Sequence, residues 1–192
     1  ARLGDSRGRD VLIKELQDTQ PRPIDPGEAR GKPDLGAQIA SDRYYAALLL
    51  GELGDKAAVP ALIAATRDDT INYRAAISLG QIGDRQAIPA LHQMVADFPK
   101  SRLWAGFGLA KLGDSTGFDI LVETVSDDSW TQRRHAVEAL GTLVDTKAVP
   151  TLIKALRDEA LPVLGLIDGR AATGKLWQDY RRLQADYLGV SR

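Results

Sequence analysis

Residues 53–63 read Leu-Gly-Asp-Lys-Ala-Ala-Val-Pro-Ala-Leu-Ile, and this stretch decides the fold because its parts recur along the chain. The opening apolar-Gly-Asp motif returns as Leu3-Gly4-Asp5, Ile82-Gly83-Asp84 and Leu112-Gly113-Asp114, and in altered form as Leu143-Val144-Asp145. From Asp55 onward the aspartates follow one another at intervals of 29, 30 and 31 residues. A period of about 30 residues is typical of repeat proteins, in which each unit packs on its neighbours.

Each unit reads as a pair of helices. The first helix carries a proline near its start, at Pro60, Pro89 and Pro150, where the missing N–H costs nothing. The second helix can be aligned on an anchor residue, which is Gly51, Gly80, Ala110 or Gly141. Four and five residues before each anchor stand small residues or a valine: Ala46-Ala47, Ala75-Ala76, Ala105-Gly106 and Ala136-Val137. Small side chains there predict close packing between the second helices of adjacent units.

The sequence therefore predicts an all-α protein, an α-solenoid or superhelix of about five helix pairs with a C-terminal capping helix. We expect one domain over residues 1–192, divided into a remnant 1–5 and units 6–55, 56–84, 85–114, 115–145 and 146–174. The capping helix is expected at 175–188, where apolar side chains recur at helical spacing, and a docking helix for a partner is the alternative. Residues 19–38 form a Pro-rich insertion, which is either a tolerated loop or an arm that contacts a ligand.

The repeat resembles the HEAT repeats, in the short subtype named for phycobilisome lyases. The likeness rests on Val59–Ile63, Asp68, Arg74–Ala76 and Leu79–Asp84, with echoes at Arg133, Ala136 and Ala139–Gly141. The resemblance implies that the second helices line the concave side of the solenoid. It also implies a ladder of an Asp with an Arg six residues later, as in Asp127 and Arg133, which Asn72 is expected to interrupt. The family includes scaffolds, chromophore lyases and metal enzymes, so it leaves the activity open.

The amino-acid composition excludes many kinds of active site. The 192 residues contain no Cys, which excludes disulfides and thiolate chemistry, and the net charge of −1 gives no general attraction to nucleic acid. His92 and His135 lie 43 residues apart and cannot form a helical zinc site. The stretch Gly169–Lys175 approaches a phosphate-binding loop, but Leu176 replaces its hydroxyl residue. We expect no catalytic residue, metal or cofactor, and a soluble, cytoplasmic, non-enzymatic protein that binds neither nucleic acid nor membrane; the oligomeric state is not predicted.

A stripe of side chains on the second helices is the candidate binding site. Seven, six and three residues before each anchor, the sequence places Tyr44, Tyr45 and Leu48, then Tyr73, Arg74 and Ile77, then Leu103, Trp104 and Phe107, then Arg134, His135 and Glu138. The predicted partner-binding residues are Tyr44, Tyr45, Tyr73, Arg74, Trp104, Phe107, Arg134 and His135. Tyr, Trp and Arg dominate binding hot spots, and the alternative is that several of these side chains pack between repeats.

The sequence thus favours a protein-interaction module or scaffold that holds a partner protein segment or peptide in its concave groove. On the second helices, six cationic residues stand against three acidic ones, which favours an acidic partner. A tetrapyrrole-binding or bilin-lyase-like protein is the alternative, because aromatic walls and a cation would suit a tetrapyrrole and its propionates.

Overall fold

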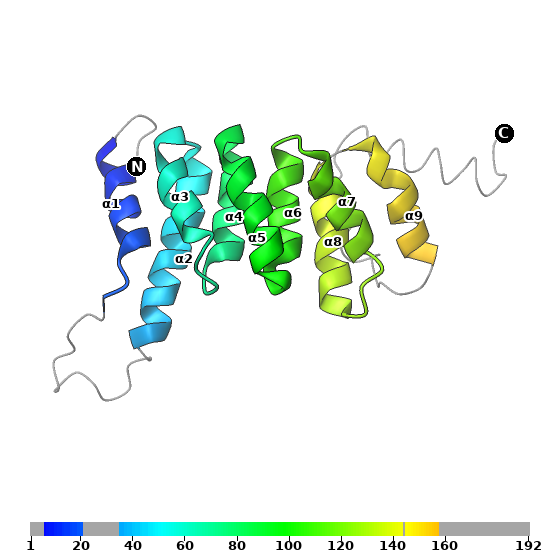
Figure 1. Cartoon of the computed structure of the whole chain (residues 1–192), viewed down its shortest axis with the longest axis horizontal. Helices are drawn as coiled ribbons and strands as arrows, with labels where there is room; N and C mark the ends of the chain where they lie inside the picture. The colour runs from blue at the N-terminus through cyan, green and yellow to red at the C-terminus, as the bar shows by residue number, and fades with distance from the viewer. Residues whose placement is uncertain (1–5, 21–34, 144, 158–192) are drawn as a thin grey trace. The chain divides into compact units, whose positions relative to one another are not determined.

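The computed structural model describes residues 6–20, 35–143 and 145–157, and every regular element in these ranges is helical (Figure 1). The α-helices are α1 (Ser6–Gln17), α2 (Leu35–Leu53), α3 (Val59–Ala65), α4 (Asn72–Ile82), α5 (Ile88–Asp97), α6 (Arg102–Lys111), α7 (Ser115–Thr124), α8 (Trp130–Leu143) and α9 (Val149–Arg157). They follow one another as helix pairs, so the prediction of an all-α solenoid is confirmed.

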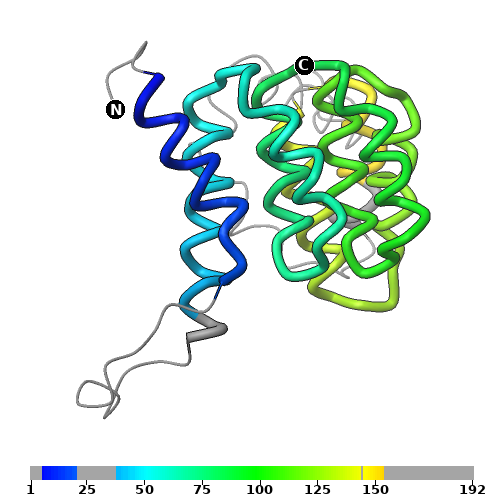
Figure 2. The backbone as a smooth tube through the Cα atoms, turned by 60° about the vertical axis from the view of Figure 1, so that its left-hand side comes forward, coloured from blue at the N-terminus to red at the C-terminus, as the bar shows by residue number. Residues whose placement is uncertain are grey.

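The chain groups into two compact units that divide between Gly117 and Phe118. In the first unit, each odd-numbered helix pairs with the even-numbered helix that follows it, and Figure 2 shows the α1–α2 pair side by side. The second helices α2, α4 and α6 also pack on one another in that order. In the second unit α8 packs on α9. The expected single domain stays a prediction.

The recurring Gly-Asp motif makes the same turn in successive repeats. Gly54, Gly83 and Gly113 have φ angles of 66°, 76° and 79°, in the left-handed region that glycine adopts without strain. The aspartate that follows each glycine accepts a hydrogen bond from the backbone N–H two residues later, and the donors are Ala57, Gln86 and Thr116. Asp145, in the altered copy of the motif, accepts from Lys147 in the same way. Except at Asp114, where α7 begins directly, the aspartate opens a short 3₁₀ turn and the next helix has its proline in the first turn. The motif therefore ends one helix pair and starts the next.

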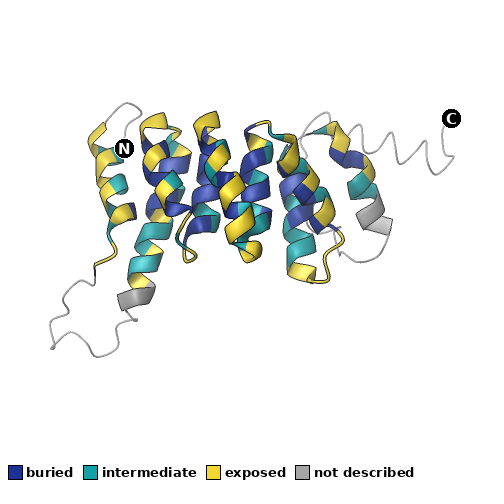
Figure 3. Cartoon of the chain, viewed as in Figure 1, coloured by how far each residue is buried: buried dark blue, intermediate teal, exposed yellow. Residues whose placement is uncertain are grey.

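Small residues bring the second helices together, as predicted. The pairs Ala46-Ala47, Ala75-Ala76 and Ala105-Gly106 are all buried between neighbouring helices (Figure 3). A Cβ atom on Gly108 would lie 2.7 Å from the Ala76 carbonyl oxygen, and one on Gly80 would lie 3.1 Å from the Gly108 Cα. Since real Cβ atoms essentially never come as close as 2.7 Å to another heavy atom, the approach of α6 to α4 requires glycine at position 108.

The predicted insertion ends earlier than expected. Helix α1 ends at Gln17 and α2 already begins at Leu35, so residues 35–38 belong to α2 and the insertion lies within 18–34. A helix that presents Leu35 and Ile39 ahead of its tyrosines can start as soon as the last proline, Pro33, has passed. The remnant 1–5, the second half of unit 146–174 and the capping helix at 175–188 lie outside the described residues.

Candidate functional site

Four aromatic side chains on three successive second helices form a continuous row, which we call the aromatic row: Tyr45 and Tyr44 on α2, Tyr73 on α4 and Trp104 on α6. The ring centroids of Tyr45 and Tyr44 are 5.3 Å apart, edge to face. Those of Tyr44 and Tyr73 are 6.0 Å apart, and those of Tyr73 and Trp104 are 6.5 Å apart, both pairs tilted. These separations are within the range of favourable aromatic pairs, so each ring supports the next.

The repeat itself explains why these rings meet. Tyr44 and Tyr73 both stand seven residues before their anchor glycine, so stacking of α2 on α4 brings equivalent positions together. Trp104 stands six residues before Ala110, and its larger ring still contacts Tyr73. Tyr45 is exposed, with 56% of its surface accessible, and the other three members are half-buried. The rings thus pack across repeats and also keep accessible surface, and their role in binding stays a prediction.

Arg74, on α4, packs against the Tyr44 ring of the aromatic row. Its guanidinium carbon lies 4.6 Å from the centre of the Tyr44 ring, and its Nη2 donates a 2.6 Å hydrogen bond to the Tyr44 hydroxyl. Its Nε is buried and has no hydrogen-bond partner among the described residues. Burial raises the pKa of the Tyr73 hydroxyl, Tyr44 adds to this effect and Arg74 opposes it. Tyr73 thus stays neutral at physiological pH and acts as an aromatic surface with a hydroxyl donor.

The remaining stripe positions on α6 behave differently from the row. Phe107 is half-buried, and the Lys111 ammonium lies 5.7 Å from the centre of its ring. Leu103 was expected to face outward, but it is buried with only 3% of its surface accessible. The outward placement of Leu103 is therefore wrong. Neighbouring residues of an α-helix project about 100° apart, so Leu103 can pack in the core while Trp104 lies toward the row.

In the second compact unit, Arg134 and His135 gather with two other residues of α8. The Arg134 guanidinium lies 5.6 Å from the centre of the exposed Trp130 ring, and its Nη1 lies 3.7 Å from a Glu138 carboxylate oxygen. The Nη2 of Arg134 is 3.4 Å from the His135 Nε2. The charge of Arg134 is therefore partly balanced by Glu138 on the same helix.

A polar ladder joins successive repeats, but not through the predicted pairs. Arg43 on α2 donates a hydrogen bond of 2.9 Å to the Leu16 carbonyl and forms an ion pair of 2.7 Å with Asp68. Burial of Asp68 acts to raise its pKa, but hydrogen bonds from Thr70 and the charge of Arg43 outweigh it, and the pKa is lowered. Arg43 thereby links α1, α2 and the turn before α4.

The expected pairing of Arg133 with the Asp127 side chain is corrected. Arg133 donates to the backbone carbonyls of Asp127 and Asp128, at 2.7 and 2.9 Å, and these are the bonds that tie it to the turn instead of a bond to the Asp127 side chain. Asn72 is fully buried: its Oδ1 accepts a 2.8 Å hydrogen bond from Ser101, and its Nδ2 has no hydrogen-bond partner among the described residues, so it does not continue the predicted Asp–Arg pairs.

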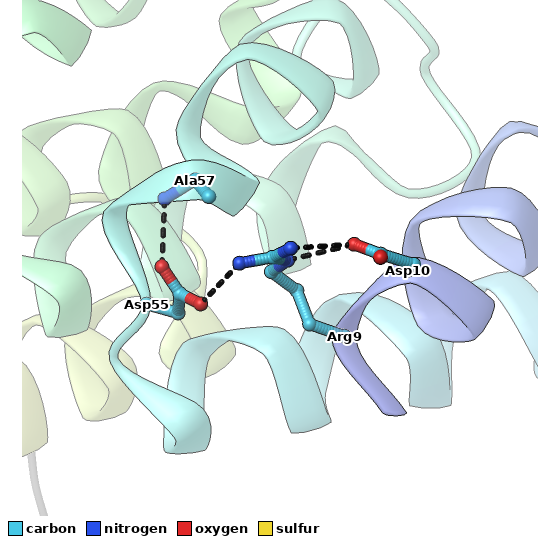
Figure 4. A network of polar contacts seen from close by, with 4 residues as sticks. All are labelled: Arg9, Asp10, Asp55 and Ala57. Atoms are coloured by element: carbon cyan, nitrogen blue, oxygen red, sulfur yellow. Dashed lines mark hydrogen bonds and ion pairs between the residues drawn. The ribbon is translucent and has the colours of Figure 1, made fainter. Parts of the chain in front are cut away.

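A second set of contacts runs along the capping aspartates. Asp55 accepts from the Ala57 N–H and pairs with Arg9, which also pairs with Asp10 on its own helix (Figure 4). Lys56 lies 4.0 Å from Asp84, and the His92 Nε2 lies 3.0 Å from an Asp114 oxygen. The backbone N–H of Ala57 and the Arg9 side chain lower the pKa of Asp55, and the His92 and Thr116 hydrogen bonds lower that of Asp114. These charges thus have structural partners.

Two other kinds of site are absent from the described residues. Within 6–20, 35–143 and 145–157, no group of three or more His, Asp or Glu side chains is arranged to hold a metal ion. No helix in these ranges is both long and apolar enough to cross a membrane. The Gly169–Lys175 stretch lies outside the described residues.

Comparisons with known proteins place the fold. The family model for HEAT repeats matches residues 37–103 and 96–165. Among solved structures, the chain is similar to the complex of CpcE and CpcF of phycocyanin lyase from Nostoc sp. PCC7120, with 19% sequence identity and a TM-score of 0.47, over 96% of this chain and 84% of that chain. No curated protein matches the sequence. The two matched ranges cover more than half of the chain and most of the helix pairs described above, and the chain belongs to the HEAT-repeat family.

Proposed function

We propose that the protein is a non-catalytic interaction scaffold that binds a partner protein segment across the aromatic row. One observation carries the proposal: the rings of Tyr45, Tyr44, Tyr73 and Trp104 touch one another across three successive second helices and keep accessible surface. The predicted concave groove around them stays part of the proposal.

The geometry suits binding because the rings are already ordered. An aromatic side chain that packs on its neighbours loses little conformational freedom when a ligand covers it, and it buries a large area. Each repeat adds one step to the row, so an extended segment could contact rings from α2, α4 and α6 in turn.

The preference for an acidic partner now rests on Arg74. Of the cations counted on the second helices, Arg43 forms an ion pair with Asp68 and Arg134 lies near Glu138. Acidic residues of the protein itself therefore balance these two charges. Arg74 is held against Tyr44 by a hydrogen bond and a cation–π contact, and it forms no ion pair with an Asp or Glu of the described residues. A carboxylate of the partner is the ligand that its guanidinium would favour.

Truncation of the row tests the proposal. A partner captured with the purified protein is titrated against the wild type, Tyr73→Ala and Trp104→Ala by calorimetry. Each variant should weaken binding by about 1–4 kcal/mol, as loss of a buried aromatic contact does. Phe98→Ala is the matched control, because Phe98 is a half-buried aromatic that packs on the core at the turn between α5 and α6.

Folding is checked first by circular dichroism and thermal unfolding. Phe98→Ala should lower stability and leave the affinity per folded molecule unchanged. If Tyr73→Ala and Trp104→Ala behave like Phe98→Ala, the rings are core residues and the proposal fails.

Charge is tested separately with Arg74→Glu. Steering acts on encounter, so this variant should slow association in a salt-dependent manner, whereas loss of an aromatic ring should mainly speed dissociation. Stopped-flow kinetics at low and high salt separates the two effects. Equal association rates for the wild type and Arg74→Glu at low salt would remove the acidic preference.

The tetrapyrrole alternative is distinguished in the same preparations. Adding a bilin to the purified protein should leave its visible spectrum unchanged if the row binds a protein segment. A spectral shift that appears with the wild type and disappears with Trp104→Ala would instead assign the row to a tetrapyrrole.

A further inference from the structure

The middle of the aromatic row holds a cation without a counter-ion. Arg74 is half-buried on α4, and within the described residues it forms no ion pair with an Asp or Glu. Arg43 and Arg134, which stand on neighbouring second helices, have Asp68 and Glu138 as acidic partners. A guanidinium that is partly withdrawn from water is stabilised by an opposite charge. At Arg74 a ligand would have to supply that charge.

The nitrogen atoms of Arg74 differ in what they contact. Its Nη2 donates to the Tyr44 hydroxyl at 2.6 Å, and its Nε is buried. Its Nη1 makes no hydrogen bond within the described residues and is not fully buried. The hydrogen bond and the ring contact with Tyr44 hold the guanidinium in one position. The Nη1 is therefore already oriented for a ligand, which lowers the entropy that binding costs.

Two tyrosine hydroxyls add hydrogen-bond donors beside Arg74. The Tyr44 oxygen accepts from Arg74, so its own proton can be donated to a ligand. The Tyr73 hydroxyl makes no hydrogen bond within the described residues and is not fully buried. Burial raises the pKa of Tyr73, Tyr44 raises it further and Arg74 opposes them, so this hydroxyl lies near both residues and keeps its proton at neutral pH. One positive charge and three donors thus gather where α2 meets α4.

This set of donors suits a carboxylate better than a phosphate. A carboxylate carries a single negative charge, which Arg74 can neutralise, and its two oxygens accept several hydrogen bonds. A phosphate monoester carries a charge of about −1.5 to −2 at pH 7, so it would need a second cation. Among the described residues Arg74 is the cation over the Tyr44 ring, and Lys111 lies over the Phe107 ring instead. The charge at this point of the row thus matches one Asp or Glu.

The distances between the rings indicate the conformation of the ligand. The ring centres of Tyr44 and Tyr73 are 6.0 Å apart, and those of Tyr73 and Trp104 are 6.5 Å apart, across helices that pack in the order α2, α4, α6. Alternate side chains of an extended chain lie on the same side, about 6.6 Å apart. In a polyproline II helix, side chains on the same side are three residues and about 9.3 Å apart. The row therefore matches an extended segment that advances two residues for each ring.

We propose that the aromatic row recognises a short extended motif of a partner protein, in which one residue separates an Asp or Glu from a large apolar residue. Arg74 and the hydroxyls of Tyr44 and Tyr73 bind the carboxylate. The apolar side chain covers the adjacent rings of Tyr73 and Trp104, and the residue between points away from the row. This inference rests on the proposed function and specifies the chemistry of its ligand.

Selection from a library of random peptides tests the motif on the full chain. The peptides are fused to a carrier at both ends, so that no terminal carboxylate is present, and those that bind the wild type but not folded Tyr73→Ala or Trp104→Ala are sequenced. An Asp or Glu should recur two positions from a large apolar residue. Row-dependent peptides without an acidic residue would overturn this inference and leave the proposed function standing. A library without row-dependent peptides would remove the proposed function and this inference together.

A double-mutant cycle assigns the carboxylate to Arg74. A selected peptide and its Glu-to-Gln version are titrated by calorimetry against the wild type and Arg74→Gln. Each single change should raise the dissociation constant about tenfold, and both together should raise it little further, because they break the same contact. Arg67→Gln is the matched control, since Arg67 is exposed in the turn after α3, and its effect should simply add to that of the peptide change. Additive effects for Arg74→Gln would overturn the assignment.

Removal of the hydroxyls and a shift of the acidic residue test the geometry. Tyr44→Phe and Tyr73→Phe keep the rings, so each should weaken binding of the Glu peptide severalfold and leave binding of the Gln peptide nearly unchanged. Moving the Glu by one position should weaken binding as much as the change to Gln, because the carboxylate then lies on the opposite side of an extended segment. Unaltered affinity of the shifted peptide would overturn the proposed spacing, and equal losses for the Glu and Gln peptides would overturn the role of the hydroxyls.

Discussion

Asp55 shows how one side chain can serve two neighbouring repeats. One carboxylate oxygen accepts from the Ala57 N–H and fixes the start of its own helix pair, and the other pairs with Arg9 on α1 at 2.9 Å. The Ala57 N–H has the larger effect in lowering the pKa of Asp55, and Arg9 adds to it. Both contacts favour the charged carboxylate, so the carboxylate stabilises the fold only while it is ionised.

The pH dependence of stability tests this role. The pKa is lower in the folded protein than in the unfolded chain, so the contribution is complete above the unfolded value of about 4 and is lost as the pH falls through the folded value. Asp55→Asn should therefore be less stable than the wild type at pH 7, and the difference should shrink below about pH 4. Urea unfolding at pH 7, 5 and 3 measures it. A constant difference over this range would exclude the charge as the cause.

Sequence reasoning identified some residue roles and missed others for a definable reason. The equivalent positions of Tyr44 and Tyr73 could be read from the repeat alone, and they do meet. The ion pair of Arg43 with Asp68 joins residues of different repeats, and the burial of Leu103 depends on how far α6 is rotated. Both depend on the stacking of one repeat on the next, which the spacing within a repeat does not specify.

At the scale of the helix, the closest packing is made by residues without side chains. Helix propensity alone favours Ala over Gly inside a helix by about 1 kcal/mol. Gly108 of α6 nevertheless lies against the Ala76 carbonyl of α4, whereas a Cβ on Gly141 of α8 would meet no atom within 4 Å. Comparing the two glycines therefore separates the effect of helix propensity on stability from the effect of close packing.

Alanine substitution at these two positions should have opposite effects. Gly108→Ala should lower the free energy of unfolding by about 1–3 kcal/mol, because the new methyl group forces α6 away from α4. Gly141→Ala should raise it by about 0.5–1 kcal/mol, since only the propensity term changes. Chemical denaturation of both variants measures the difference. Stabilisation by Gly108→Ala would mean that α4 and α6 are not held at this distance.

From the sequence, the ends of the helices could be predicted better than the contacts between helices. The turns at Gly54, Gly83 and Gly113 were specified by the Gly-Asp motif, because glycine alone adopts their positive φ angles readily. The start of α2 was placed four residues too late, since the Pro-rich stretch before it obscured the first helical turn at Leu35. The Gly-Asp motif thus predicts where the helices between repeats end. The start of α2 is harder to predict, because the prolines before it resemble a longer loop.

At the scale of the whole molecule, stability should come from contacts between adjacent repeats. The insertion between α1 and α2 adds length without changing which helices pack, because α1 already contacts α2 through Arg43 and the turn before α3 through Arg9. Loop length is a weak term in stability, with about 0.6 kcal/mol for each doubling.

Shortening the insertion tests this view of the molecule. Replacement of residues 21–33 by a brief Gly/Ser link should leave the far-ultraviolet circular dichroism per helical residue nearly unchanged and alter the free energy of unfolding by less than about 1 kcal/mol. The deletion is compared with the wild type by thermal and urea unfolding. Global unfolding of the shortened chain would show that the segment belongs to the core.

The contact of Tyr73 with Trp104, at 6.5 Å between ring centres, also makes the molecule its own optical probe. Light absorbed by a tyrosine this close to a tryptophan is passed on to it, so excitation of Tyr44 and Tyr73 should emerge as indole emission from Trp104. A ligand that settles on the rings would change the colour and intensity of that emission without any added dye. The arrangement that we propose for binding therefore also reports whether the surface is occupied.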